Sequence, residues 1–366
     1  MRIFSISPAG VQESSELPGQ LPAQGYLWIS CARQEFGARV AEVQAALQAL
    51  CGLQLVDLHV SDLLNAQLPS HFDYTSQYDL LVFRRLASGS TASNDNGSTA
   101  PTPPRGGPPI LHRIDTSPVG FAVFERVLLS VHPADCAVRD AYAARLLQAA
   151  AGDARAVPGR LPSAPADLML RIVNQMVDGF LELRRELTRQ LDHWQTELLN
   201  PRARFSNWTA LLEARLTLHH LDEVCEDQRQ AVLDWIEVME DWPEAGTPLA
   251  QRERDLLQVR SRDVLEHIER VVHHVRRLEH SVETAVQIHF NAQGHRTNDI
   301  MRTLTVLTAI FLPLNLIAGI FGMNFDFIPL IHSSSGFWWT MISMGLIAVI
   351  LAIYFWRKRY LERSGR

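Results

Sequence analysis

Two long stretches of the sequence, residues 303–321 and 337–356, contain no charged residue. A helix that crosses the hydrocarbon core of a lipid bilayer takes about 20 residues, and both stretches reach that length. An uncharged, apolar helix of this kind is also costly to expose to water. We therefore expect two membrane-spanning helices in contact with membrane lipid, and a more polar chain in front of them.

Basic residues flank the two expected spans only before the first span and after the second span, which are called the outer flanks here. The loop between the spans, residues 322–336, contains no lysine or arginine, whereas the outer flanks contain Arg296, Arg302, Arg357, Lys358 and Arg359. Lysine and arginine accumulate on the cytoplasmic side of a membrane protein, so we expect both termini in the cytoplasm and the loop outside. Residues 357–366 would form a basic cytoplasmic tail. The expected location of this multi-pass protein is a bacterial-type inner (plasma) membrane. No apolar segment with a basic flank opens the chain, so we expect no cleaved signal peptide.

The chain before the first span carries more acidic than basic side chains. This balance favours cations over nucleic acids as partners, so we expect no nucleic-acid binding. The sequence contains no glycine-rich phosphate loop followed by Lys-Ser or Lys-Thr, and we find no other enzyme signature in it. We therefore expect neither an enzyme nor a resident cofactor. The cysteines have no Cys-X-X-Cys spacing and are expected to be reduced: Cys31, Cys51, Cys136 and Cys225.

Residues 1–165 mix strand and helix patterns, which predicts an N-terminal cytoplasmic α/β domain. A helix is predicted at residues 36–50 and another from about Ala134. Strands are predicted at residues 26–30, 53–57, 79–85, 119–124 and 127–132, the last two forming a hairpin. Residues 87–109 are rich in Ser, Gly, Asn, Thr and Pro, which predicts a flexible insertion without apolar side chains to bury.

Long helices are predicted from residue 166 to the membrane. Apolar periodicity indicates helices at residues 166–199 and 205–241, with breaks at Asn200-Pro201 and Trp242-Pro243. A third helix would begin near Leu249 and continue without a break to Phe321. At 1.5 Å per residue such a helix is on the order of 105 Å long. We therefore expect residues 166–302 to form a helical cytoplasmic domain and stalk.

One face of the third helix repeats apolar residues at alternating steps of four and three. This is a heptad pattern, formed by Val264, Ile268, Val271, Val275, Leu278, Val282, Ala285, His289 and Ala292. Such a seam packs either against copies of itself or against other helices of the same chain, and the pattern alone leaves both open.

A polar turn follows the first span directly. Residues 321–327 read Phe-Gly-Met-Asn-Phe-Asp-Phe, and residues 311–319 before them contain Phe-Leu-Pro-Leu, two further residues, then Ile-Ala-Gly. A backbone that leaves a helix at this depth must face water or line a hydrated path. The run resembles the first transmembrane helix and Gly-Met-Asn signature of the CorA divalent-cation transporters. The clear resemblance covers residues from about 297 to 359.

Membership of that family implies a fold and a function. The implied fold is an α/β cytoplasmic domain with a long helical stalk and two C-terminal transmembrane helices, assembled as a pentameric funnel. The implied function is channel-like transport of divalent cations through a homopentameric pore, with Mg²⁺ as the first expectation and partly or fully hydrated ions as the cargo. The self-association implied here favours a seam shared between copies.

A single face of the first span carries the candidate pore-lining residues. Steps of three and four place them together: Asn298, Met301, Leu304, Thr308, Leu312, Asn315 and Gly319. A carboxamide in hydrocarbon is costly unless it faces water or a neighbouring helix, so Asn315 is a pore candidate, with an inter-helix hydrogen bond as the alternative.

The resemblance also implies roles for individual residues. Asn324 occupies the outer selectivity ring, Gly322 and Met323 shape its turn, and Asp326 supplies the charge of the outer loop. Five amide oxygens would suit a hydrated Mg²⁺, which dehydrates reluctantly. Met301 and Leu304 resemble the hydrophobic constriction. Thr297 and Asn298 match the polar inner mouth. Gln287 stands where an acidic ring is expected, which should weaken attraction for a divalent ion there.

Histidines on the third helix keep a second ion class open. Imidazole favours Zn²⁺, Ni²⁺ or Co²⁺ over Mg²⁺, and His289 falls on the heptad seam, where five copies would converge. Asp263 is a candidate for the regulatory Mg²⁺ sensing of CorA proteins. The alternatives are therefore a Zn²⁺, Co²⁺ or Ni²⁺ transporter of the same fold, or a membrane-anchored coiled-coil sensor or scaffold without transport.

Overall fold

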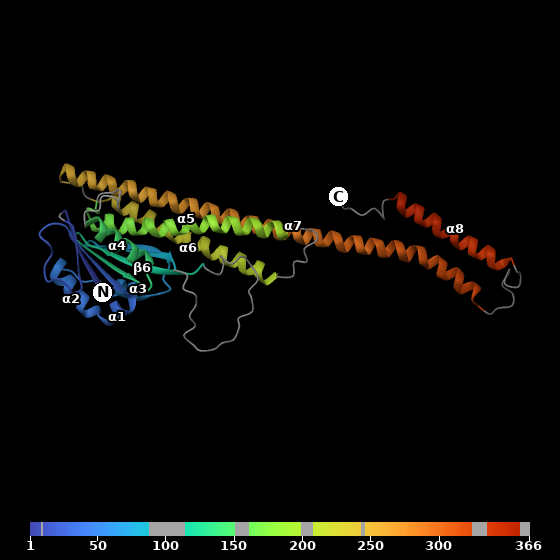
Figure 1. Cartoon of the computed structure of the whole chain (residues 1–366), viewed down its shortest axis with the longest axis horizontal. Coiled ribbons are helices and arrows are strands. Elements are labelled where there is room, and N and C mark those ends of the chain that lie inside the picture. Colours follow the sequence, from blue (N-terminus) through green and yellow to red (C-terminus); the bar gives the residue numbers. More distant parts are fainter. Residues whose placement is uncertain are drawn as a thin grey trace. The chain divides into compact units, whose positions relative to one another are not determined.

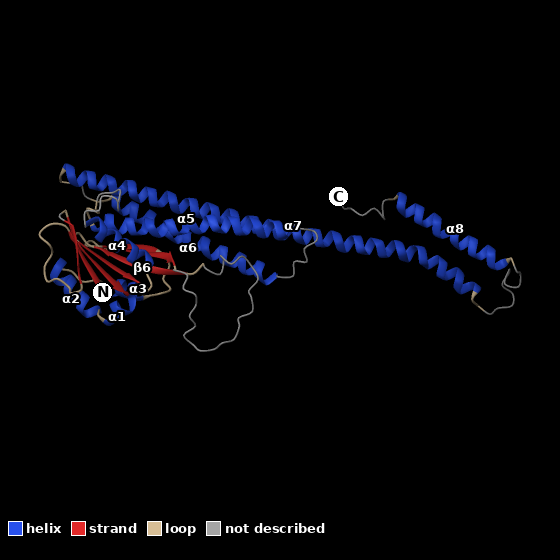
Figure 2. Ribbon diagram, viewed as in Figure 1, coloured by secondary structure: helices blue, strands red, loops and turns tan. Residues whose placement is uncertain are grey.

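The computed structural model describes residues 1–8, 10–87, 114–150, 161–198, 208–242, 246–323 and 335–358. The chain divides into two compact units, Met1–Glu283 and Thr284–Arg366. Helices and strands of both units are drawn in Figures 1 and 2. The expected insertion at residues 87–109 lies outside the described residues except for Ala87.

The first unit is built around a mixed seven-stranded sheet with the strand order β2-β1-β3-β7-β6-β5-β4. Its strands are β1 (Arg2–Ser7), β2 (Gly10–Ser14), β3 (Tyr26–Ala32), β4 (His71–Tyr74), β5 (Asp79–Leu86), β6 (Thr116–Val123) and β7 (Val127–His132). Strands β3 and β7 pair in parallel, and the other described pairs are antiparallel. The predicted hairpin at residues 119–132 is confirmed as β6 and β7.

Helices cover both faces of this sheet (Figures 1 and 2). One face packs against α1 (Arg33–Ala38), α2 (Val40–Cys51) and α3 (Asp57–Leu64), and the other against α4 (Ala137–Ala150), α5 (Pro165–Leu198) and α6 (Trp208–Glu240). Burial on both faces explains why every residue of β7 is buried. It also explains why Ser130 and His132, the polar residues of β7, are buried together with its apolar residues.

Two local predictions are wrong. The helix predicted at residues 36–50 is two helices, because Arg39 has φ −123° and ψ 23° and interrupts the helix between α1 and α2. The strand predicted at residues 53–57 does not form. There the side chain of Gln44 donates to the Leu55 carbonyl at 2.9 Å and accepts from the Leu55 amide at 2.8 Å, which takes the place of a strand partner.

The predicted long helices are confirmed. Helices α5 and α6 match the predicted ranges closely, and α7 (Pro248–Phe321) is a single helix of 74 residues. In the first unit α7 packs on α5 and α6. The Trp235 indole donates to the Ser261 hydroxyl at 3.0 Å, Arg276 pairs with Asp222 at 3.0 Å, and Thr188 lies 2.7 Å from the His274 ring.

The heptad seam is used inside a single chain. Its members from Val264 to Val282 are all buried within the first unit: Val264, Ile268, Val271, Val275, Leu278 and Val282. These side chains already have partners in their own chain, which is the packing alternative that the pattern left open. Self-association therefore does not depend on this part of the seam, and the side chain of Ala292 lies outside the described residues.

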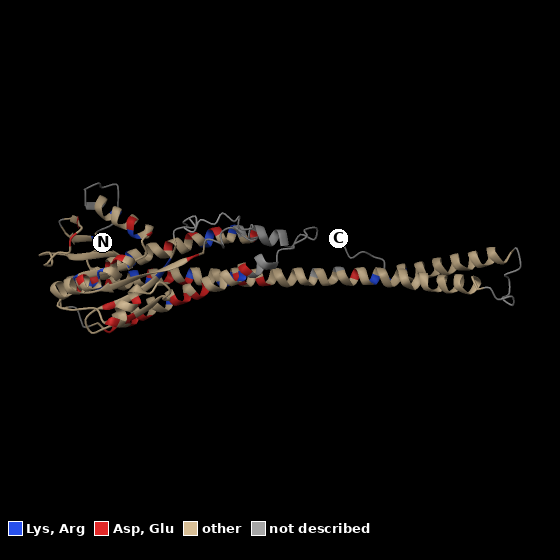
Figure 3. Cartoon of the chain, turned by 90° about the horizontal axis from the view of Figure 1, so that it is seen from below, with Lys and Arg blue, Asp and Glu red and all other residues tan. Residues whose placement is uncertain are grey.

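The second unit contains the rest of α7 and α8 (Gly336–Arg357). Both helices are long and apolar enough to cross a membrane, and only 6% of the apolar window of each is buried. Figure 3 shows charged residues along the ribbon of the first unit and almost none on α8 and the last turns of α7. Pro313 lies inside α7, which is tolerated in membrane helices where neighbours or water satisfy the freed backbone groups.

Candidate ion pathway on helix α7

One exposed stripe of α7 carries the candidate pore residues. Met301, Leu304 and Leu312 are 57%, 54% and 69% exposed, although they are apolar. The polar and small members of the stripe are exposed as well: Asn298, Thr308, Asn315 and Gly319. No described residue of the chain covers this stripe. An apolar surface of this kind is available to lipid, to another copy of the chain, or to both.

The two polar side chains inside the span differ in their hydrogen bonding. The Thr308 hydroxyl donates to the Leu304 carbonyl, one turn earlier, at 2.9 Å. Its proton is therefore satisfied by its own helix. The Asn315 carboxamide makes no hydrogen bond to any described residue, and it is exposed. In a membrane this amide needs water or another chain, because an unpaired amide in hydrocarbon costs several kcal/mol.

The helix ends where the signature begins. Helix α7 stops at Phe321, the Gly322 amide donates to the Ala318 carbonyl at 2.9 Å, and the Met323 amide donates to the Ile320 carbonyl at 3.2 Å. A Cβ atom at position 322 would lie 3.0 Å from the Ala318 carbonyl oxygen. This contact is tight enough to explain a glycine there. Asn324 and Asp326 lie outside the described residues.

The expected inner mouth lies on a polar stretch of α7. Thr297 and Gln287 are both exposed, and the Thr297 hydroxyl donates to the Gln293 carbonyl at 3.1 Å. The Gln293 amide nitrogen lies 3.2 Å from Nε2 of His289, which is partly exposed. These side chains offer hydroxyl, amide and imidazole groups as ligands, and none of them is a carboxylate.

Asp263 and His289 occupy separate stretches of α7, and the structure does not bring them into one site. Asp263 instead lies beside His267, with 3.7 Å between its Oδ1 and the imidazole Nε2. The other ring nitrogen of His267, Nδ1, is buried without a hydrogen-bond partner in the described chain. The pairing of Asp263 with His267 was missed, although residues four apart on a helix are neighbours.

A single chain offers no complete metal site over the residues that the structure describes. There, no group of three or more His, Cys, Asp or Glu side chains is placed to hold an ion. A bound divalent ion needs several oxygen or nitrogen ligands, and the described part of the chain supplies no such set from these four residue types.

Comparison with known proteins relates the whole arrangement to one family. The model of the family described as "CorA-like Mg2+ transporter protein" matches residues 40–359. Over 194 residues the chain is 26% identical to the cobalt/magnesium transport protein CorA of Thermotoga maritima, a match that covers 53% of this chain and 52% of that protein. The match thus spans about half the length of that relative.

Two further likenesses are to a curated relative and to a solved structure. Over 101 residues the chain is 32% identical to the magnesium transport protein CorA of Escherichia coli, covering 28% of this chain and 32% of that protein. The solved CorA magnesium transporter from Methanocaldococcus jannaschii matches 100% of this chain and 98% of its own, with a TM-score of 0.71 and 18% identity. At that identity the match shows the fold.

Proposed function

The chain belongs to the family of CorA-like Mg²⁺ transporter proteins, and from this premise we propose that it is a channel-like transporter that takes up hydrated Mg²⁺ through a homopentameric pore. It would act as an ion transporter and not as an enzyme, and Mg²⁺ would be its cargo and a regulatory ion rather than a cofactor. The observation that carries the proposal is the uncovered stripe of α7, which bears an Asn315 amide without a partner in the described chain.

A pore formed by five copies of α7 would account for the exposed apolar surface of that stripe and for its Asn315 amide without a partner. The stripe would face a shared axis, and the Asn315 amides would find water or one another there. The opposite faces of α7, together with α8, would contact lipid. The Thr308 hydroxyls would add a ring of oxygens, since each keeps acceptor capacity after donating to the Leu304 carbonyl.

The selectivity ring is proposed at the outer end of α7. Asn324, shaped by Gly322 and Met323, would present five amide oxygens to an ion that keeps its water shell. The C-terminal ends of the five helices would assist, because helix carbonyls there carry partial negative charge. Asp326 would raise the local concentration of cations. Met301 and Leu304 would form an apolar constriction that closes by dewetting, with Leu312 and Gly319 lining the path outside it.

The inner end of the path is proposed to be weakly attractive for cations. Thr297 and Asn298 would form a polar mouth, and Gln287 would stand there without a carboxylate charge. Asp263 and His267 are proposed as one half of a regulatory metal site that a neighbouring copy completes. The unpartnered Nδ1 of His267 also supports the alternative that Zn²⁺, Co²⁺ or Ni²⁺ is bound or transported, as imidazole prefers these ions.

The membrane arrangement is proposed as follows: residues 1–302 in the cytoplasm, spans at residues 303–321 and 337–356 in the inner membrane, an external loop at 322–336 and a cytoplasmic tail at 357–366. With the cell interior negative, entry is favoured by about 2.3 kcal/mol per charge per 100 mV, roughly twice that for a divalent ion. Uptake therefore requires no further energy source.

Ion flux into liposomes tests this proposal. Under an inside-negative potential the purified protein should carry Mg²⁺, and side-by-side assays with Zn²⁺, Co²⁺ and Ni²⁺ identify the preferred ion. Asn324→Ala should reduce Mg²⁺ flux at least tenfold, as one lost ring of charge-assisted contacts costs on the order of 1.5–3 kcal/mol. The oligomer should stay intact by native mass spectrometry.

The matched control is Asn65→Ala, which removes an exposed asparagine from the loop after α3 and should leave the flux unchanged. Absence of flux for every ion in the unsubstituted protein, with an intact oligomer, would instead support the scaffold without transport.

A further inference from the structure

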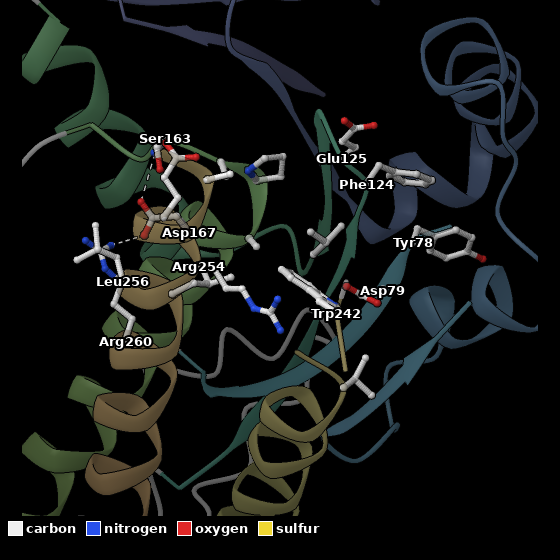
Figure 4. A pocket seen from close by; sticks show the side chains of 18 of the residues that line it. Tyr78, Asp79, Phe124, Glu125, Ser163, Asp167, Trp242, Arg254, Leu256 and Arg260 are labelled. Atoms are coloured by element: carbon white, nitrogen blue, oxygen red, sulfur yellow. Dashed lines mark hydrogen bonds and ion pairs between the residues drawn. The ribbon is translucent and has the colours of Figure 1, made fainter. Parts of the chain in front are cut away.

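A cavity of about 990 Å³ lies in the first unit, far in sequence from the candidate ion pathway. Its walls come from the turn between β4 and β5, the turn between β6 and β7, the start of α5, the end of α6 and the first turns of α7 (Figure 4). A volume of this size is typical of sites that bind small molecules. Nothing in the transport proposal uses it.

Asp79 places a carboxyl group in this cavity without a partner. It is the first residue of β5, and among the described residues its side chain forms no hydrogen bond or ion pair. Burial raises the pKa of the Asp79 carboxyl to about 6, and burial is the one cause that acts on it. The arginines that line the cavity therefore do not compensate this charge.

Those arginines are engaged elsewhere. Arg171 lies 3.1 Å from Asp167, and Arg260 contacts the same carboxylate from α7 (Figure 4). Arg254 donates to the carbonyls of Met239 and Glu240 at 2.9 and 3.1 Å, where it satisfies the last carbonyls of α6. Three guanidinium groups at the cavity thus already have acceptors on the protein.

The remaining charges at the cavity give an excess of negative charge. Arg252 is exposed on α7, and the carboxylates that line the cavity besides Asp79 and Asp167 are also exposed: Glu125, Asp241 and Glu253. Together with Asp79 and Asp167 they make five carboxylates in the cavity lining, against four arginines. The unmatched charge of the cavity therefore favours a positively charged ligand over an anion.

The walls of the cavity are aromatic and apolar, which suits an organic cation better than a metal ion. Tyr78 and Phe124 pack with ring centroids 4.9 Å apart, and Trp242 packs edge-on against Trp235 at 5.8 Å. Aromatic faces attract ammonium groups. A divalent metal would need several oxygen or nitrogen ligands, and the described residues place no such group of three together.

We propose that this cavity binds a small organic ammonium ion, whose charged group pairs with the Asp79 carboxylate and whose apolar body lies against Trp242 and Phe124. The ammonium group would supply the hydrogen-bond donors that the chain does not give to Asp79. This site is independent of the transport proposal, because its ligand is neither the transported ion nor bound on the ion pathway.

The test is a ligand-observed NMR titration of the full-length protein in nanodiscs with two probes of nearly the same shape. Phenethylamine carries an ammonium group, and 2-phenylethanol carries a neutral hydroxyl in its place. At pH 7.5 the amine should bind about tenfold more tightly than the alcohol, as a charge-assisted pair contributes more than a neutral hydrogen bond. Asp79→Asn should remove this preference.

The matched control is Asp255→Asn, which neutralises an exposed carboxylate on the same stretch of α7 but outside the cavity lining. It should keep the tenfold preference. Lowering the pH to 5 should weaken amine binding about tenfold in the unsubstituted protein, because Asp79 is then mostly protonated while the amine stays charged.

Equal affinity for the amine and the alcohol, no binding of the amine, or amine binding that Asp79→Asn leaves unchanged would overturn the proposal. Asp79→Asn removes a half-buried uncompensated charge, so a fold at least as stable as the original is expected, as checked by circular dichroism. Should that variant fail to fold, the comparison of the two probes and of the two pH values in the unsubstituted protein decides.

Discussion

The buried imidazole of His132 links the stability of the first unit to pH. Its Nδ1 donates to the Pro133 carbonyl at 2.9 Å, so Nε2 is the acceptor and lies 2.9 Å from the Ser30 hydroxyl and 3.3 Å from Arg139. Burial first, and then the Arg139 charge, lower the pKa of His132 to about 4. The folded protein therefore holds a neutral imidazole at any pH near neutrality.

This lowered pKa predicts acid sensitivity. Between pH 6.5 and about 4 the unfolded chain binds a proton at His132 and the folded chain does not, so folding stability falls as the pH falls. Over this pH range the free energy of unfolding falls by about 3 kcal/mol. His132→Gln should flatten the pH dependence of the unfolding midpoint over this window, measured by thermal denaturation followed by circular dichroism. His219→Gln, a control at an exposed histidine, should not.

Helix α7 combines two environments along one continuous element. Before Glu283 its seam is buried against α5 and α6, and after it the helix carries apolar residues that the described chain leaves exposed. The first stretch belongs to the core of one chain, whereas the second is proposed to contact lipid and other copies. Damage to the seam should therefore affect folding of the chain before it affects assembly.

Val275 and Val259 provide a matched test of this division. Val275 is fully buried in the seam, and Val259 is 62% exposed on the same helix. Val275→Ala should lower the free energy of unfolding by about 2 kcal/mol through lost burial and the cavity left behind. Val259→Ala should change it little. Chemical denaturation measures both, and a Val275→Ala protein that dissociates without losing unfolding stability would contradict the assignment.

The sequence predicts the elements with strong periodicity and clear breakers well. Helices α5, α6 and α7 fall under this rule, as do the apolar strands β5, β6 and β7. Residues 53–57 have the composition of a strand, yet the Gln44 side chain binds the Leu55 backbone instead. Such a contact links residues eleven positions apart through one rotamer, and no local pattern encodes it.

The candidate sites were predictable to different degrees. The stripe on α7 follows from helical spacing alone, so Asn315 and Thr308 are found from the sequence. The heptad pattern does not state whether its partner helix belongs to the same chain, and only packing decides that. Asp79 looks like an ordinary strand residue, because its cavity is assembled from β5, α5, α6 and α7 together.

For the molecule as a whole, family membership and the uncovered stripe lead to one physical claim. We propose that several copies of the α7 stripe surround a watery axis through which a divalent ion passes. The claim requires that the stripe face water and that the opposite face of the same helix do not. Leu312 lies on the stripe, and Ile310 lies about 160° away from it around the helix at 100° per residue.

The most direct measurement is block of Mg²⁺ flux by a membrane-impermeant cationic methanethiosulfonate reagent, compared between Leu312→Cys and Ile310→Cys in liposomes. The unsubstituted protein is the control, because any block of its flux by the reagent would come from the native cysteines. We expect the reagent to abolish flux through Leu312→Cys, and Mg²⁺ in excess to slow that reaction, while Ile310→Cys continues to conduct. Block at Ile310→Cys with Leu312→Cys unaffected, or equal behaviour of the two, would contradict a pore lined by this face of α7.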